Sequence, residues 1–285
     1  MRDISKYILP KDRPVAIQFS GGRTSGFMLY HILKAHDGKL PDDAHVLFQN
    51  TGREMPETLD FVQACANHWG VKIRWLEFVT EKPLFQEVGH NSAARNGEPF
   101  EALIGQRKYL PNVVTRFCTE VLKVRTARRF LISQGYTRWT AVIGFRRDEP
   151  TRVLKIKAKP RPREVAFLPL WDDHVSRYEV SDFWEAQKFD LDLKNIKGKT
   201  ALGNCDGCFL KSEANLAHLA RYYPERAVWW ADQERKMIEL TGEKKTFTKD
   251  RSWSDLQKIT NQQSDWVFET DNDLLCSTSL GGCHD

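Results

Sequence analysis

The stretch Ser20-Gly21-Gly22-Arg23-Thr24-Ser25 connects a predicted strand to a predicted helix. The apolar run at 15–19 predicts a buried strand, and residues 26–33 predict a helix. Glycines let the backbone approach a ligand closely, and a helix N-terminus offers N–H donors and partial positive charge. Arg23 can pair with an anionic oxygen through two N–H groups. We therefore expect a phosphate-binding turn; the alternative is an ordinary capped turn, and a Walker A loop is excluded by spacing.

Strand-like and helix-like segments alternate after this turn. Residues 44–49 and 71–76 predict strands, and Pro56 opens a helix between them. This alternation predicts an α/β fold, a Rossmann-like parallel sheet with helices on both faces. We expect a long loop at 91–115, a basic helix at 120–133 and a basic loop at 155–163.

The chain divides into two predicted parts. Residues 1–195 form a nucleotide-binding domain, and residues 196–285 form a smaller region with a CxxC turn, an aromatic helix and a cysteine-containing tail. A net charge of +5 suits an anionic ligand, a nucleotide or nucleic acid. No apolar run approaches the ~20 residues of a membrane helix, and the N-terminus has no apolar signal segment. We therefore expect a cytoplasmic protein without a membrane partner.

Polar residues follow two further predicted strands. Asn50-Thr51-Gly52 ends the strand at 44–49, and Gly144 with Arg146-Arg147 follows a strand at 140–144. Ligands bind at the carboxyl ends of parallel strands, so these residues and the turn at 20–25 predict one anionic-ligand site. The alternative for the arginines is a solvated basic surface.

Cysteines supply a second constellation. Cys205 and Cys208 stand in a glycine-rich CxxC turn, where two thiolates can bind one metal or one iron–sulfur cluster. No histidine pair has zinc-finger spacing, which favours iron–sulfur over zinc. The further ligands are expected from Cys118, Cys276 or Cys283, although Cys118 could instead be a small buried residue.

The sequence resembles the phosphoadenosine phosphosulfate (PAPS) and adenosine phosphosulfate (APS) reductases. These belong to the adenine nucleotide alpha hydrolase (PP-loop ATP pyrophosphatase) superfamily. The turn at 20–25 is similar to the PP-loop S-G-G-K-D-S, and residues 50–58 are similar to D/N-T-G-x-x-x-P-E-T. Further similar segments follow in family order: Cys118 with Lys123-Val124-Arg125, Gly144 to Glu149, Pro169 to Asp172 with Asp182 to Trp184, and Cys205 to Cys208.

This resemblance implies an adenine nucleotide over the Ser20 loop and a 4Fe–4S cluster nearby. Cys118, Cys205 and Cys208 would hold the cluster, with Cys276 or Cys283 as the fourth ligand. Arg23 and Thr24 replace the Lys and Asp of the PP-loop, which weakens the prediction of ATP cleavage. Cys283 stands in a Gly-Gly-Cys-His tail, where the reductases carry their attacking cysteine.

Three functions follow from these observations. The first is a sulfonucleotide reductase-like oxidoreductase that takes PAPS or APS, uses Cys283 as nucleophile and receives electrons from a thiol donor such as thioredoxin. The second is an ATP-dependent sulfur transferase acting on tRNA or DNA, whose basic segments contact phosphates. The third is a non-catalytic module that binds a nucleotide and a cluster.

Overall fold

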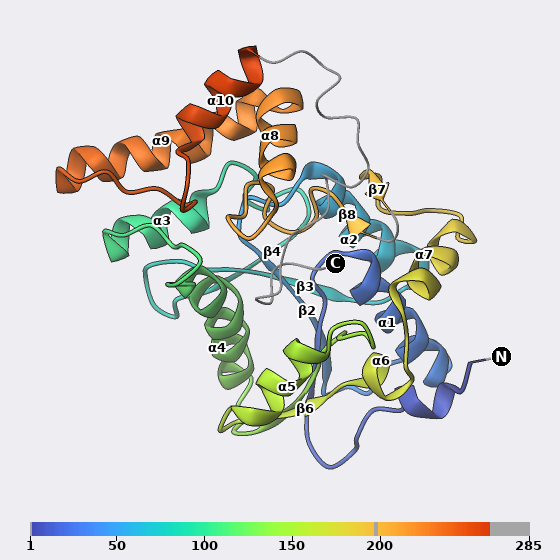
Figure 1. Cartoon of the computed structure of the whole chain (residues 1–285). Helices are drawn as coiled ribbons and strands as arrows, with labels where there is room; N and C mark the ends of the chain where they lie inside the picture. Colours follow the sequence, from blue (N-terminus) through green and yellow to red (C-terminus); the bar gives the residue numbers. More distant parts are fainter. Residues whose placement is uncertain (1, 197–198, 263–285) are drawn as a thin grey trace.

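The computed structural model describes residues 2–196 and 199–262. Its main sheet has six strands in the order β4-β3-β2-β1-β5-β6 (Figure 1). Neighbours among β1, β2, β3, β5 and β6 pair in parallel, and β4 pairs antiparallel with β3. The strands are β1 Val15–Gln18, β2 Ala44–Asn50, β3 Ile73–Glu77, β4 Gln86–Val88, β5 Trp139–Val142 and β6 Glu164–Phe167. A two-stranded ribbon is formed by β7 Asn195–Ile196 and β8 Lys199–Thr200.

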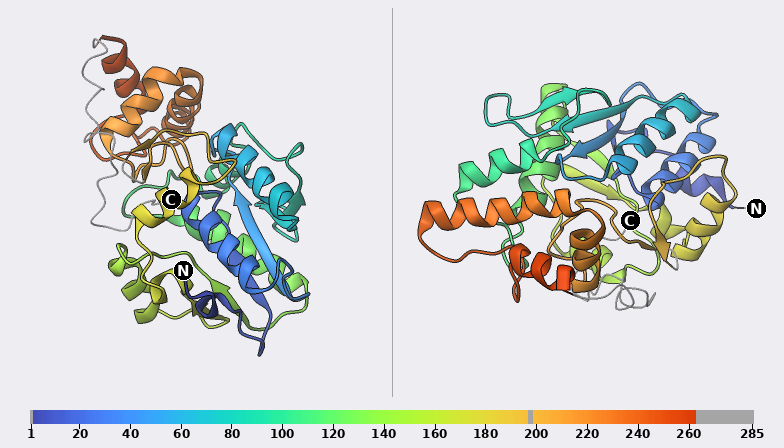
Figure 2. Two further views of the ribbon diagram at one scale, coloured as in Figure 1. Left: turned by 90° about the vertical axis from the view of Figure 1, so that its right-hand side faces the viewer. Right: turned by 90° about the horizontal axis from the view of Figure 1, so that it is seen from above.

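Helices occupy the connections. They are the 3₁₀-helix η1 Ile4–Tyr7, α1 Arg23–Ala35, α2 Pro56–Trp69, α3 Glu98–Arg107, the π-helix η2 Thr119–Arg125, α4 Thr126–Ser133, α5 Pro150–Ala158, α6 Pro169–Asp172, α7 Arg177–Glu185, α8 Glu213–Tyr222, α9 Pro224–Thr241 and α10 Trp253–Gln262. The last three helices gather at one end of the molecule, beyond the carboxyl end of the sheet (Figure 2). The predicted boundary near residue 195 stays a prediction.

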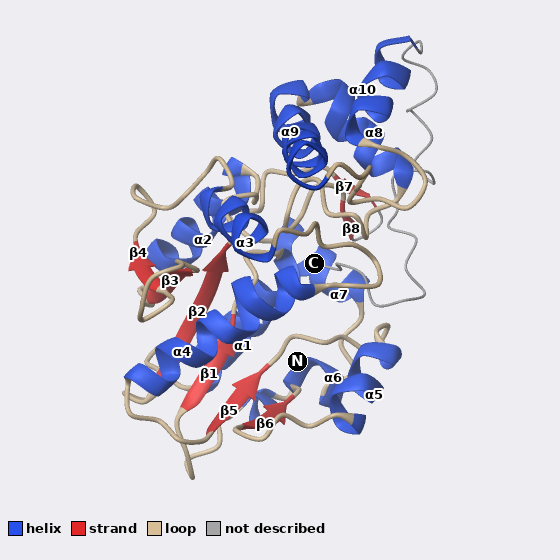
Figure 3. Ribbon diagram, turned by 90° about the vertical axis from the view of Figure 1, so that its left-hand side faces the viewer, coloured by secondary structure: helices blue, strands red, loops and turns tan. Residues whose placement is uncertain are grey.

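Two cores cover the two faces of the sheet. Side chains that alternate along β1 and β2 point in opposite directions, as the two-residue period of a strand requires. Ile17 and Phe48 join the core that includes α1 and α2, whereas Ala16 and Leu47 join a smaller core under α4. Figure 3 shows α4 lying across the strands on that second face. The α/β fold with helices on both faces is thus confirmed.

The strand order reverses direction at β1. Strands β2 and β3 lie on one side of β1, and β5 and β6 lie on the other. In such sheets the connections leave opposite ways at this point and open a crevice outside the carboxyl ends of the strands. The turn at 20–25 follows β1 and Gly144 follows β5, so both border this crevice.

Three local expectations need correction. The segment at 91–115 contains the helix α3, whose buried Phe100, Leu103 and Ile104 pack into the main core. The segment at 120–133 begins as π-helix and becomes the α-helix α4 only at Thr126. The expected basic loop at 155–163 includes the end of α5, a helix in which Val153 is buried and most other side chains are exposed.

Candidate functional site

The turn after β1 has the backbone expected of an anion site. Gly21 has φ +79°, and a Cβ there would stand 2.8 Å from the Thr58 methyl carbon, so only glycine fits. Gly22 precedes α1 as its N-cap and has no side chain to cap the helix. The first N–H groups of α1 therefore face the crevice, as helix N-termini do in phosphate sites.

Hydroxyl groups of this turn are held in place by each other. The Ser25 Oγ donates to the Gly22 carbonyl at 2.9 Å and accepts from the Ser20 backbone N–H at 3.2 Å. The Ser20 and Ser25 hydroxyls are 3.1 Å apart. Ser20, Thr24 and Ser25 all line a cavity of about 230 Å³ at the carboxyl end of the sheet.

The Arg23 side chain turns away from this cavity. Its Nε and Nη2 donate to the two carboxylate oxygens of Asp190 at 2.8 and 2.9 Å, and its Nη1 donates to the Thr200 hydroxyl at 3.0 Å. The guanidinium, expected on an anion, instead fastens the chain after α7 to the start of α1. What Arg23 brings to the crevice is its backbone, at the first position of the helix.

The sequence predicted a site at Asn50, Thr51 and Gly52, at the end of β2. Of these three residues, Thr51 lines the cavity. The Asn50 side chain, fully buried, donates to Glu77 at 2.6 Å and accepts from the Gly52 N–H at 3.1 Å. Gly52 has φ +77°, and a Cβ there would stand 2.9 Å from the Gly97 backbone. Asn50 and Gly52 thus shape the loop that presents Thr51.

The loop after β5 contributes Gly144 to the cavity wall. Arg146 is buried beside it, where its Nη1 donates to the Thr24 hydroxyl at 2.6 Å and its Nε to Asp148 at 3.0 Å. Arg147 is exposed. Arg146 therefore orients the Thr24 hydroxyl in the turn at 20–25, and Arg152, on α5, lines the cavity itself.

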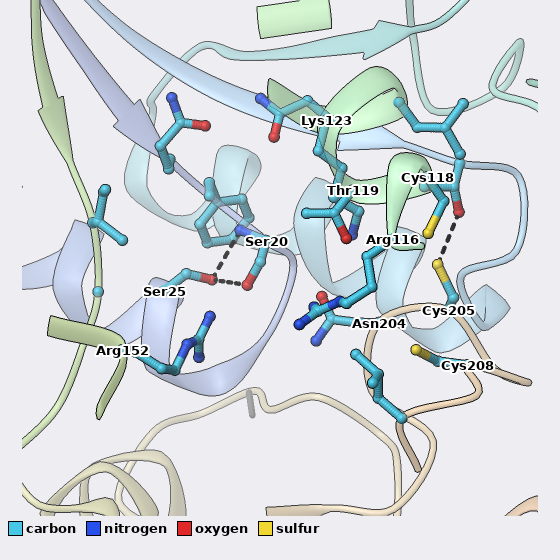
Figure 4. Close-up of a pocket in the computed structure, with 18 of the residues that line it drawn as sticks. Ser20, Ser25, Arg116, Cys118, Thr119, Lys123, Arg152, Asn204, Cys205 and Cys208 are labelled. Carbon is cyan, nitrogen blue, oxygen red and sulfur yellow. Dashed lines mark hydrogen bonds between the residues drawn. The ribbon is translucent and has the colours of Figure 1, made fainter. Parts of the chain in front are cut away.

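Two further cations approach from the segment that carries Cys118. Arg116 and Lys123 line the cavity, and Figure 4 shows Arg116 lying between the Ser20–Ser25 side and the cysteine side. The sequence reasoning did not select Arg116, because it lies just before the π-helix η2, and no sequence pattern predicted that π-helix. Short π-helical segments are frequent at functional sites.

Three thiols form the opposite wall. Cys118, Cys205 and Cys208 line the same cavity as Ser20 and Ser25 (Figure 4). Cys65 is different: it is fully buried in the core, and burial raises the pKa of its thiol far above the ordinary range. The expected grouping of Cys118 with the CxxC turn is thus seen, while Cys276 and Cys283 lie outside the described residues.

A buried carboxylate stands behind the Cys205 thiol. The Glu54 Oε2 accepts from the Thr51 N–H at 2.8 Å and from the Thr51 hydroxyl at 2.7 Å. The Thr51 hydroxyl is in turn 3.3 Å from the Cys205 Sγ. The Lys123 Nζ lies 3.6 Å from the Glu54 Oε1 and offsets its charge. Glu54 lies inside the motif at 50–58 at a variable position, so sequence reasoning missed it.

The CxxC turn is locked to the rest of the site through Asp206. This fully buried carboxylate accepts from Arg53 at 2.7 Å and from the Trp230 indole N–H at 2.8 Å, and it also pairs with Arg226. The Arg53 guanidinium lies over the Trp229 ring, 4.7 Å from its centroid. The loop after β2, the thiol-bearing turn and α9 are therefore joined by one charge cluster.

The thiols of Cys118, Cys205 and Cys208 are of the type that binds zinc or an iron–sulfur cluster. Within residues 2–196 and 199–262, however, no three His, Cys, Asp or Glu side chains are arranged to hold a metal ion. A four-thiolate site would need one further ligand beside these three thiols.

The chain belongs to the phosphoadenosine phosphosulfate reductase domain family, whose model matches residues 14–187. It is 30% identical over 210 residues to the uncharacterized nin region protein ORF290 of Escherichia phage lambda, covering 70% of this chain and 67% of that protein. It is 25% identical over 231 residues to an uncharacterized protein of Methanocaldococcus jannaschii, covering 80% of this chain and only 42% of that protein.

Two solved structures resemble the fold weakly. The PAPS reductase of Candida auris, a phosphate complex, has a TM-score of 0.39 at 16% identity and covers 64% of this chain and 76% of its own. The U34-tRNA thiolase NcsA of Methanococcus maripaludis, with its [4Fe-4S] cluster, has a TM-score of 0.42 at 14% identity. The match covers 82% of this chain and 78% of the thiolase.

The family match confirms the resemblance found in the sequence and indicates a nucleotide-binding protein of sulfur chemistry. The described helices include none that combines the length and the apolar character needed to cross a membrane.

Proposed function

We propose that this chain is a sulfonucleotide reductase-like enzyme that binds an adenine nucleotide with its phosphate on the turn at 20–25. One observation carries the proposal: the phosphate turn and the thiols of Cys118, Cys205 and Cys208 line a single cavity. A phosphosulfate bound on the turn would point its sulfur toward the thiol wall. The cations of Arg116, Lys123 and Arg152 would stabilise the charge of the leaving phosphate.

The reaction takes place in three displacements. A cysteine thiolate, assigned here to Cys283, attacks the sulfur of the phosphosulfate; an S–S bond forms, the S–O bond breaks, and AMP or its 3′-phosphate derivative leaves with the electron pair. A thiolate of a dithiol donor then attacks the cysteine sulfur and releases sulfite. The second donor thiol resolves the mixed disulfide, so that the donor is oxidised to its disulfide and the cysteine is regenerated.

A 4Fe–4S cluster is the cofactor that we assign to the thiol wall, held by Cys118, Cys205 and Cys208, with Cys276 as the fourth ligand where Cys283 acts as the nucleophile. When bound, it would supply a redox-active, sulfur-rich surface next to the nucleotide. Zinc is less favoured, because the described part of the cavity wall contains no histidine. Anaerobic purification followed by an absorbance spectrum and an iron count tests this assignment.

The test of the activity is sulfite release from PAPS and from APS with a dithiol reductant. We expect sulfite from at least one of them, and loss of sulfite in Cys283→Ser. Full activity of that variant would overturn the nucleophile assignment. Tight adenine-nucleotide binding without any turnover would instead indicate a non-catalytic module.

A second function, ATP-dependent sulfur transfer to tRNA or DNA, is favoured by one surface feature. The cations of α5 and the residues after it are exposed: Lys155, Lys157, Lys159, Arg161 and Arg163. Such a run suits a phosphodiester backbone, and its affinity would fall steeply with salt. Binding of tRNA or duplex DNA at low salt, followed by ATP-dependent incorporation of labelled sulfur, would favour this function over reduction.

A further inference from the structure

A second cavity adjoins the one that holds the phosphate turn. It has a volume of about 180 Å³ and lies between α4 and the face of the sheet that α4 covers. The two cavities share part of their walls, including Gln18, Gln49, Lys123 and Arg152. Its floor is formed by buried apolar residues of β5, Trp139 and Ala141. A ligand in the first cavity can therefore be accompanied by a group in the second.

Positive charge dominates the second cavity. Arg128, Arg152 and Arg161 line it together with Lys123, whereas Glu164 is the carboxylate that lines it in the described part of the chain. The Glu164 carboxylate is shared, 2.8 Å from Arg161 and 3.8 Å from Arg128. One carboxylate cannot neutralise two guanidinium groups.

The remaining two cations have partners outside the lining. The Arg152 Nη1 lies 2.6 Å from Glu149, and Lys123 lies 3.6 Å from Glu54. These carboxylates hold their cations at the border between the two cavities. Counted together, the four cations face three carboxylates, so the net charge of the group is positive.

Buried hydrogen-bond donors also point to a ligand. The Gln49 side chain is 8% exposed, lines both cavities, and its Nε2 has no hydrogen-bond partner among the described residues. The Nε atom of Arg128, which lines the second cavity, is also buried and has no hydrogen-bond partner among the described residues. A buried donor without an acceptor is costly and rare, so each such group calls for a partner. Both groups are donors, which selects a ligand that supplies acceptor oxygens.

We propose that the second cavity binds a phosphate- or sulfate-type oxyanion. The proposal rests on the proposed function, because Gln49 and Arg152 border both cavities. Guanidinium groups pair with such oxyanions in bidentate fashion, and an apolar floor strengthens the attraction. A water molecule could accept from Gln49 and Arg128, but it would leave the positive charge without a counterpart. The oxyanion is either a second charged group of the bound nucleotide or a separate inorganic ion.

Calorimetric titration of the full chain tests this proposal. The ligands are sodium sulfate, AMP, and adenosine 3′,5′-bisphosphate, each at one fixed ionic strength because salt screens exposed charges. The variants are Arg161→Ala and Arg128→Ala. The matched control is Arg235→Ala, which removes an exposed guanidinium of α9 that pairs with Asp232 and Glu239 and lines neither cavity.

We expect the second oxyanion to bind the wild-type chain and to lose about tenfold in affinity in both variants, but not in the control. Sulfate that binds together with AMP identifies a separate ion. Tighter binding of the bisphosphate than of AMP, lost in Arg161→Ala, identifies a group carried by the nucleotide.

Binding of AMP with no variant-sensitive binding of either sulfate or the extra phosphate would overturn this proposal and leave the proposed function standing. Failure of AMP itself to bind would contradict the proposed function, and sulfate binding that is weaker in Arg161→Ala than in the wild type would still show that the second cavity holds an oxyanion.

Discussion

Arg53 and Asp206 form a buried ion pair across two loops that are 153 residues apart, with 2.7 Å between the Arg53 Nη2 and the Asp206 Oδ2. Arg53 belongs to the loop after β2 that presents Thr51, and Asp206 stands between the two cysteines of the CxxC turn. This pair joins the loop that presents Thr51 to the turn that carries the two thiols.

The first prediction concerns the loss of that pair. Asp206→Asn should lower the free energy of unfolding by about 3 kcal/mol, because it leaves the buried Arg53 and the nearby Arg226 without a counter-charge. Urea denaturation measures the change. Asp232→Asn, which removes an exposed carboxylate paired with Arg235, is the control and should have no measurable effect. Equal stability of Asp206→Asn and the wild type would show that the cluster is not held by charge.

The second prediction concerns the glycine that shapes the loop after β2. Gly52→Ala places a Cβ 2.9 Å from the Gly97 backbone at φ +77°, so strain and a clash add. Gly38 has a similar φ of +80°, and a Cβ added there would meet nothing within 4 Å, so Gly38→Ala measures the strain alone. We expect Gly52→Ala to have the lower thermal midpoint and weaker AMP binding. Similar midpoints for both variants would contradict the packing argument.

The third prediction concerns the hydroxyl at the centre of the phosphate turn. Ser25→Ala removes the bonds to Ser20 and to the Gly22 carbonyl, and should weaken AMP binding about tenfold. Calorimetry measures the affinity. Ser133→Ala removes a comparable hydroxyl bond, to the Phe130 carbonyl at the end of α4, and should leave the affinity unchanged. An unchanged affinity in Ser25→Ala would remove the turn from the binding site.

The fourth prediction concerns Glu234 on α9. Its carboxylate accepts from the Phe247 N–H at 3.0 Å and from the Trp253 N–H at 2.8 Å, which ties the segment before α10 to α9. Burial raises the pKa of Glu234 from its ordinary 4.5 to about 7, although these two hydrogen bonds act in the opposite direction. The folded chain therefore binds this proton more tightly than the unfolded chain.

The raised pKa of Glu234 makes the stability of the fold depend on pH. Between about pH 4.5 and 7 the native state holds more protons at this site, so the free energy of unfolding falls as the pH rises, by about 3 kcal/mol in total. Glu234→Gln should remove that slope, whereas Glu239→Gln, at an exposed site, should keep it. Identical pH slopes in all three proteins would contradict the raised pKa.

The sequence predicted the elements whose signals are local. The strand and helix around the turn at 20–25 were predicted correctly because the apolar periodicity and the glycines that indicate them lie in neighbouring residues. The elements β2, α2 and β3 were predicted for the same reason. The helix α3 was missed because the glycines and prolines at 97, 99, 105 and 111 predicted a loop, although Phe100, Leu103 and Ile104 have helical spacing. Its burial comes from packing against a distant part of the chain.

For the site, too, residues with a local sequence signal were predicted, and residues whose roles depend on distant partners were not. Thr51 and Gly144 were predicted at one anionic-ligand site because strand ends have local signatures, and Cys205 and Cys208 were predicted as metal or cluster ligands because a CxxC turn has one. The structure brings all four to one cavity. Arg23 was expected on an anion, but its partner Asp190 lies 167 residues away and no local pattern indicates it. Glu54 and Asp206 were missed likewise, since their partners are brought together only by the fold.

The measurement that tests the central claim most directly is cysteine alkylation with and without AMP. The protein is first incubated with an iron chelator and then treated briefly with iodoacetamide, and labelling is read for each cysteine by mass spectrometry. If nucleotide and thiols share one cavity, AMP slows the labelling of Cys118, Cys205 and Cys208, while the buried Cys65 stays unlabelled throughout. Saturating AMP that leaves the labelling of all three unchanged would contradict a shared cavity.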